Sequence, residues 1–177
     1  MAKFWNFVFF QLGWFACILG AAHQHELWAV IGSLGYIAIY IWRSQTPKLE
    51  LTLLLKVLSF GILTDSLLMY LGFLDFKGTW PSPYLSPAWM WALWLLVAST
   101  LNSSLSWLNG KPVLGMVLGA ISGPLSYEAG IRMGAANWGS GSHILGLGLI
   151  SLVWAVAMPL FFYWVGPIVK AKLVKNP

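Results

Sequence analysis

Charged residues are scarce in this chain: Asp, Glu, Lys and Arg make up 8% of its 177 residues, while 59% are hydrophobic. A soluble globular domain carries about a quarter charged residues, so the composition excludes that class. The length accommodates about six membrane spans of about 20 residues and leaves no room for a separate soluble catalytic domain. The excess of 10 Lys and Arg over 5 Asp and Glu does not indicate nucleic-acid binding, because the basic residues are scattered along an apolar chain.

Cysteine and the common catalytic motifs are also scarce or missing. Cys17 is the only cysteine, which excludes an intrachain disulfide. The sequence has no phosphate-binding loop, no G-x-S-x-G, no H-E-x-x-H, no haem or iron–sulfur cysteines and no dinucleotide fingerprint. We therefore expect no cofactor, and the sequence leaves open whether the protein is an enzyme.

Long apolar segments are what the sequence does contain, and they predict an all-α integral membrane protein. We expect a single domain of residues 1–177 that folds as a bundle of six transmembrane helices. The predicted helices lie near residues 4–22, 27–42, 51–74, 87–108, 112–133 and 144–166. The first segment is expected to be a retained helix and not a cleaved signal, because Trp5, Asn6 and Gln11 are unusual in signal peptides.

The distribution of lysine and arginine predicts the topology. The loops and ends on one side contain most of these residues: Lys3, Arg43, Lys48, Lys111, Lys170, Lys172 and Lys175, with Lys56 one turn inside the third helix. The opposite side receives only Lys77 and Arg132. Because basic residues are concentrated in cytoplasmic loops, both termini are predicted to be cytoplasmic.

Residues 112–138 contain glycine or serine on nearly every helical turn. Two neighbouring rows repeat at intervals of four residues: Gly115, Gly119 and Gly123 in one, and Ser122, Ser126, Gly130 and Gly134 beside it. A helix face without large side chains lets another helix approach closely. We therefore predict that this helix is the central packing element of the bundle.

Asp65 is the deepest charged residue in the predicted helices, about 21 Å along a hydrocarbon layer of about 30 Å. A carboxylate at that depth must be paired, protonated or in contact with water. Gly61 and Gly72 are predicted to share its face and to let a neighbouring helix approach. The predicted partners are polar groups of the first or fifth helix: Gln11, Tyr127 or Ser126. Asp65 is then either a hydrogen-bonded clamp between helices or a functional group.

Glu128 and Arg132 are four residues apart and share one helix face. The simpler interpretation is an ion pair at the end of the fifth helix, which contributes at most about 1 kcal/mol. The alternative uses the predicted topology, which places Asp65, Glu128, Arg132 and His143 in the outer half of the membrane. In that case these groups converge on a site that binds or processes a lipid headgroup.

The fourth predicted helix carries a stripe of polar residues: Ser99, Asn102, Ser103 and Ser106. Residues of this kind commonly hydrogen-bond across membrane helices, so we expect them to stabilise helix packing. The stripe is also compatible with a polar route through the bundle that includes Asp65.

The three histidines, His23, His25 and His143, are weak candidates for a metal site together with Glu26 and Asp75. They lack the pair of histidines four residues apart that zinc-binding helices use, and loop histidines are common. The sequence therefore predicts no metal site.

Several segments resemble a family of small bacterial inner-membrane proteins that is known only as a domain of unknown function. They are F-W-N-F-V-F-F-Q-L-G-W-F at 4–15, the region of Asp65, P-A-W-M-W-A-L-W at 87–94, T-L-N-S-S-L-S-W-L at 100–108 and G-P-L-S-Y-E-A-G at 123–130. The resemblance implies a multi-pass protein of the bacterial inner membrane. Genes of this family lie beside genes for cyclopropane-type fatty-acid modification and oxidative-stress control, which implies membrane lipid chemistry by association. Family members do not all have an acid at the position of Glu128, which favours Asp65, Asn6 and Gln11 as functional residues.

These observations favour a protein that binds, organises or helps to modify membrane lipid or fatty-acyl groups in a pocket of the bundle, as an accessory subunit. One alternative is a small transporter or permease that uses Asp65 and the Asn102 stripe. Another is an assembly factor that packs on a partner membrane protein. The expected partners are membrane lipids or another membrane protein, and no nucleic acid.

Overall fold

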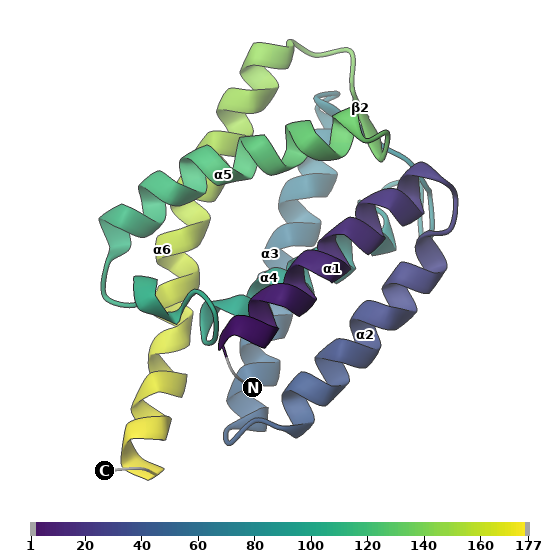
Figure 1. The fold of residues 1–177 in the computed structure, drawn as a ribbon. Helices are drawn as coiled ribbons and strands as arrows, with labels where there is room; N and C mark the ends of the chain where they lie inside the picture. Colours follow the sequence, from purple (N-terminus) through teal and green to yellow (C-terminus); the bar gives the residue numbers. More distant parts are fainter. Residues whose placement is uncertain (1–2, 176–177) are drawn as a thin grey trace.

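The structure of the protein is a computed structural model, and it describes residues 3–175 (Figure 1). The helices of this part of the chain are α1 (Lys3–Ala22), α2 (Glu26–Trp42), α3 (Pro47–Tyr70), α4 (Ala88–Leu101), the short 3-10 helix η1 (Ser106–Leu108), α5 (Pro112–Arg132) and α6 (His143–Lys175). Two short strands, β1 (Leu74–Phe76) and β2 (Ala136–Trp138), pair antiparallel. The all-α prediction is therefore correct apart from this small sheet.

Three of the described helices are long and apolar enough to cross a membrane: α1, α3 and α6. The shorter helices α2 and α4 are also apolar. Large apolar side chains are exposed on the outside of the long helices, for example Phe4, Leu63 and Leu152. Exposed apolar surface on this scale is typical of a protein that is surrounded by lipid. These helices indicate a membrane protein.

The central helix is α4, and the prediction that residues 112–133 form the centre is wrong. Most residues of α4 are buried, including Trp89 and Trp94, and the helix packs against α1, α2, α3 and α6. A helix that is apolar on all sides is buried on all sides. The helix α5 lies at the edge and packs chiefly against α6 (Figure 1). A row of small residues provides one close contact, whereas a central helix needs large apolar side chains around its circumference.

The contact between α5 and α6 confirms the predicted role of the first glycine row. A Cβ atom on Gly119 would lie 2.5 Å from the backbone oxygen of Trp154, and one on Gly123 would collide with the Trp154 ring. At Gly115 the packing is looser, because a Cβ atom there would lie 3.8 Å from Met158 Cβ. The two helices therefore pack backbone to backbone over the middle of this row.

Two glycines end α3 and α5 in the same way and direct the chain into the two strands. Gly72 and Gly134 have positive φ angles of 75° and 87°. The following residues donate back into the helix, Phe73 N to Leu68 O at 2.9 Å and Ala135 N to Gly130 O at 3.0 Å, which is the Schellman arrangement. The third helix thus ends at Tyr70, before the predicted residue 74, and Gly72 does not lie on the face of Asp65.

The other helix ends also differ from the predicted ranges. The third helix begins at Pro47 instead of residue 51, because proline is well suited to the first helical position. The fourth ends at Leu101 instead of 108, because the side chains that follow bond to groups outside the helix; Ser104 Oγ, for instance, donates to Asn6 Oδ1 at 2.7 Å. The sixth continues to Lys175, past the predicted residue 166, with Pro159 and Pro167 inside it.

The ends of the helices lie in two groups (Figure 1). The start of α1, the turn between α2 and α3 and the end of α6 lie at one end of the molecule, and the sheet and the turn between α1 and α2 lie at the other.

Candidate functional site

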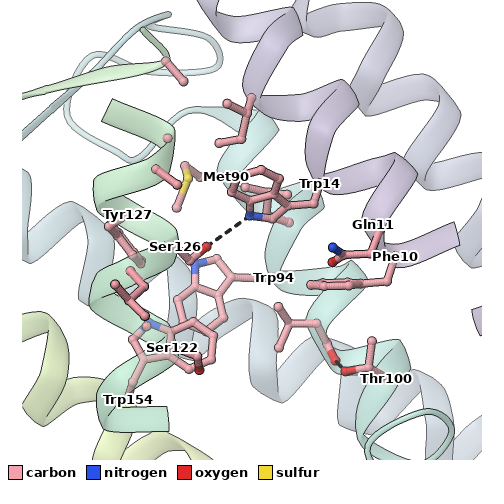
Figure 2. Close-up of a pocket in the computed structure, with 18 of the residues that line it drawn as sticks. Phe10, Gln11, Trp14, Met90, Trp94, Thr100, Ser122, Ser126, Tyr127 and Trp154 are labelled. Atoms are coloured by element: carbon pink, nitrogen blue, oxygen red, sulfur yellow. Dashed lines mark hydrogen bonds between the residues drawn. The ribbon is translucent and has the colours of Figure 1, made fainter. Parts of the chain in front are cut away.

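A cavity of about 500 Å³ lies between α1, α4 and α5 (Figure 2). One face of α1, with side chains three or four residues apart, forms the first wall: Phe7, Gln11, Trp14 and Ile18. One face of α4 forms the floor and includes Met90, Leu93 and Val97. The cavity has the size of an ordinary small-molecule site, which is about 300–1,000 Å³.

The opposite wall is the second row of small residues on α5. It is formed by Ser122, Ser126 and Gly130, which the sequence predicted to pack against another helix. Of these three residues only Gly130 does so, because a Cβ atom there would lie 3.1 Å from Ile18 Cδ1. At Ser126 the gap is bridged by a hydrogen bond from Trp14 Nε1, at 3.1 Å, and at Ser122 the small side chain leaves open space (Figure 2).

The cavity opens sideways, between α1 and α5. Two of its lining side chains are large, apolar and exposed: Phe7 of α1 is 51% exposed and Leu125 of α5 is 64% exposed. The opposite end is closed by Leu74 and Phe76 of β1 and by Ala136 of β2. Because the outward faces of α1 and α5 are apolar, the mouth opens towards the region that lipid occupies.

Two polar side chains on the walls formed by α1 and α5 have no hydrogen bond to another described residue. They are the amide of Gln11 and the hydroxyl of Ser122, both of which line the cavity (Figure 2). Gln11 lies about 12 Å along α1 from Lys3, near the middle of an apolar helix. A polar group without a partner in apolar surroundings is unfavourable, so these two groups are available to a ligand.

Asp65 lies behind the cavity wall and does not line it. It is fully buried, and its two carboxylate oxygens accept hydrogen bonds from Trp94 Nε1 at 2.7 Å and from the Tyr127 hydroxyl at 2.5 Å. Gly61 leaves the space in which the Trp94 ring lies. The carboxyl group thereby connects α3 with α4 and α5, as the clamp interpretation expects.

Of the three predicted hydrogen-bond partners of Asp65, one is correct. Tyr127 is a partner, whereas Ser126 bonds to Trp14 and Gln11 faces the cavity. Sequence reasoning missed Trp94. The sequence feature that could have indicated Trp94 is Gly61, which lies one turn before Asp65 and leaves space for a large ring.

Glu128, Arg132 and His143 do come together, at the end of α5. Glu128 Oε1 lies 2.7 Å from Arg132 Nε, and its Oε2 lies 3.4 Å from His143 Nε2 and accepts a hydrogen bond from Trp138 Nε1 at 3.2 Å. The side chain of Arg132 is 78% exposed, so the pair is a surface ion pair of small energy. These three residues do not line the cavity, and Asp65 forms no bond with them. Glu128, Arg132 and His143 therefore lie together at the surface, and Asp65 is not part of this group.

Asn6 and the polar residues after α4 form a second network. Asn6 is buried, and its amide donates to the Tyr36 hydroxyl at 2.7 Å and to Ser99 O at 3.2 Å. Asn102 donates to Glu50 Oε1 at 2.7 Å. The predicted polar stripe is thus not one face of a helix, because α4 has ended before Asn102. Its residues stabilise packing, as the first of the two interpretations expects.

Sequence reasoning missed Glu50, which is only 2% exposed. Besides Asn102, it accepts a hydrogen bond from the Tyr40 hydroxyl at 2.8 Å and lies 3.5 Å from Lys172 Nζ. The residue was missed because the predicted third helix began one residue after it. Pro47, as the first residue of α3, was the signal that places Glu50 in the first helical turn.

The weak metal candidates are not gathered into a site. Within residues 3–175, no group of three His, Cys, Asp or Glu side chains is arranged to hold a metal ion. His143 contacts Glu128 and lies 4.4 Å from the ring of Trp138, whereas His23 and His25 lie in the turn between α1 and α2.

The model of a family described as Protein of unknown function (DUF2878) matches residues 3–160. The chain belongs to this family. Recognition of an uncharacterised family from sequence segments is therefore confirmed. The match to DUF2878 includes all three walls of the cavity. No curated protein and no solved structure matches the chain.

Proposed function

We propose that the protein binds an acyl chain of a membrane lipid in the cavity between α1, α4 and α5, and serves as an accessory subunit that binds, organises or presents lipid for modification. The observation that carries the proposal is the sideways mouth between Phe7 and Leu125. A water-soluble ligand would enter from a loop end, and the sheet closes one of these ends, whereas a lipid chain enters directly from the bilayer.

The polar groups of the cavity fit the same ligand. Gln11 and Ser122 lie on different walls of an otherwise largely apolar and aromatic space, and both lack a partner among the described residues. An ester or hydroxyl group on the bound molecule would accept or donate at these side chains. The small residues of α5 leave the volume that the chain would occupy.

The other candidate functions have less support. A transport route through Asp65 and Asn102 would need free polar groups, but both oxygens of Asp65 are hydrogen-bonded and Asn102 is bonded to Glu50. A partner membrane protein would have to dock on an outer face, since the glycine row that was its predicted contact is covered by α6. The lipid-binding proposal is therefore the stronger one.

We further propose that all six α-helices cross or enter a bacterial inner membrane with both chain ends in the cytoplasm. The excess of Lys and Arg on that side supports this orientation. A reporter fused after Pro177, which lies outside the described residues, is expected to be active in its cytoplasmic form. A reporter that is active only outside the cytoplasm contradicts the orientation.

Lipid binding is tested with a variant that fills the cavity and leaves the remaining surface unchanged. Ser122→Phe places a ring in the open space, and Val117→Phe is the matched control on the exposed outer face of the same helix. Each protein is purified in mild detergent and the phospholipid that it retains is measured by native mass spectrometry. A phospholipid with a photoreactive acyl chain maps the contact.

We expect wild type and Val117→Phe to retain one lipid that cross-links to α1 and α5, and Ser122→Phe to lose it. Gln11→Leu is expected to weaken retention by up to about tenfold, the effect of one hydrogen bond. Equal retention and cross-linking in Ser122→Phe and wild type would overturn the proposal.

A further inference from the structure

A second hollow lies on the outer surface, between α3 and α6, about 530 Å³ in volume. Its lining combines large apolar side chains with a few polar ones. The polar members are Thr52, Lys56 and Ser59 of α3, and the apolar members include Phe60, Leu63, Leu160 and Trp164. It shares no lining residue with the cavity between α1 and α5.

Lys56 is the unusual residue of this groove. It lies about 13 Å along α3 from Pro47, beyond the first two turns of a helix that is long enough to span a membrane. Its ammonium group lies 5.7 Å from the ring centre of Trp164 and forms no ion pair with a described residue. A cation on a lipid-facing surface is costly unless it reaches the interface or meets an anion.

The neighbouring polar groups add donors at the same place. Ser59 is exposed and has no hydrogen bond to another described residue, whereas the Thr52 hydroxyl donates to Lys48 O at 2.9 Å. Lys48 is two helical turns before Lys56 on the same face of α3 and is also exposed. The groove thus offers a positive charge and a free hydroxyl, and no acidic side chain lines it. It lies towards the end of the molecule that is rich in basic residues.

We propose that the groove between α3 and α6 binds one anionic phospholipid, with its phosphate at Lys56 and Ser59 and an acyl chain on Phe60, Leu63 and Leu160. The charge supplies the selectivity, because the groove presents a cation that nothing in the described chain neutralises. Basic sites between helices on the cytoplasmic side are suited to anionic headgroups. The apolar residues that follow Lys56 towards the middle of α3 contact the acyl chain of the lipid.

The test uses the full-length protein in nanodiscs and native mass spectrometry with two lipids, phosphatidylglycerol and phosphatidylcholine. Lys56→Met removes the charge and keeps the length of the side chain, and Lys56→Arg keeps the charge. The matched control is Lys111→Met, because Lys111 also lies 5.7 Å from the ring centre of a tryptophan, Trp107, but is outside the groove. Thermal unfolding of each variant checks that it is folded.

We expect wild type to retain phosphatidylglycerol in preference to phosphatidylcholine, and Lys56→Met to weaken retention of phosphatidylglycerol alone, about fivefold. Lys56→Arg and Lys111→Met should behave as wild type. The proposal is overturned if Lys56→Met leaves the preference unchanged, or if it weakens both lipids equally. It is also overturned if the variant changes the oligomeric state, since the groove would then hold a second copy of the chain. Ser122→Phe is expected to leave this site intact, which separates it from the acyl-chain cavity.

Discussion

The two rows of small residues on α5 have the same chemistry and nearly the same spacing, but they have different surroundings. Gly119 and Gly123 contact the backbone and ring of Trp154 on α6, with no space for a further atom. Ser122 and Ser126 face a cavity, because α1 is in contact with α5 at Gly130 and is separated from it towards Phe7. A small residue in a membrane helix therefore permits either close packing or an open space, and the course of the neighbouring helix decides between them.

The first prediction tests the packed row and has the largest expected effect. Gly119→Leu should destabilise the fold by about 1–3 kcal/mol or more, because even its Cβ atom would collide with Trp154 O. Gly148→Leu on α6 is the matched control, since nothing lies within 4 Å of a Cβ atom there. Thermal unfolding in detergent measures both. Equal stability of the two variants would mean that the row of Gly119 is not closely packed against α6.

The second prediction concerns Asp65, which is bonded to α5 through Tyr127, four residues after Gly123. In Asp65→Asn the amide oxygen still accepts from Trp94 and the amide group donates to the tyrosine oxygen, so the fold should persist with a loss of about 0.6–1.7 kcal/mol. Asp65→Leu leaves two buried donors without an acceptor, so it should lower the free energy of unfolding by more than Asp65→Asn does.

Lipid retention is the second measurement on the Asp65 variants. If Asp65 is only a clamp, the Asn variant retains lipid as wild type does. A well-folded Asn variant that has lost lipid retention would show that the carboxyl group itself has a chemical role, and would contradict the clamp interpretation.

The third prediction has the smallest expected effect and compares one hydrogen bond on each side of α5. Ser126→Ala removes the acceptor of Trp14 Nε1, and Ser151→Ala removes a bond of 2.8 Å from α6 to Ala120 O. Each should cost about 0.6 kcal/mol, the average for such bonds between membrane helices. Only Ser126→Ala should alter lipid retention, because only that bond crosses the cavity wall. Identical lipid retention in both variants would argue against this wall as a binding surface.

Part of the site was predictable from single residues. The depth of Asp65 required a buried partner, and Tyr127 was among those named because it lies on a helix that glycine allows to approach. Gln11 was named as a partner of Asp65 but lines the cavity instead. The spacing of Gln11 along α1 indicates a face, but it does not specify which of the other helices that face meets.

The strands were not predicted, although their signal was present. Leu71–Gly72 and Met133–Gly134 each end a helix, and the residues that follow pair as Leu74 with Trp138 and Phe76 with Ala136. Glycine that tolerates positive φ is a local property and can be recognised in a sequence. Pairing of two segments about sixty residues apart depends on where the helices place them, and it cannot be recognised from either segment alone.

The sequence by itself determined that the protein is helical and apolar, that glycine at 115, 119 and 123 permits a close helix contact, and that Asp65 needs hydrogen-bond donors. These follow from the chemistry of each residue and the period of the helix. Only the tertiary structure decided that α4 is central, that the close contact is with α6, and that Ser122 and Gln11 face a cavity. Periodicity indicates which residues share a face, but the partner of a face depends on the directions of several helices at once, and those are fixed by packing over the whole chain.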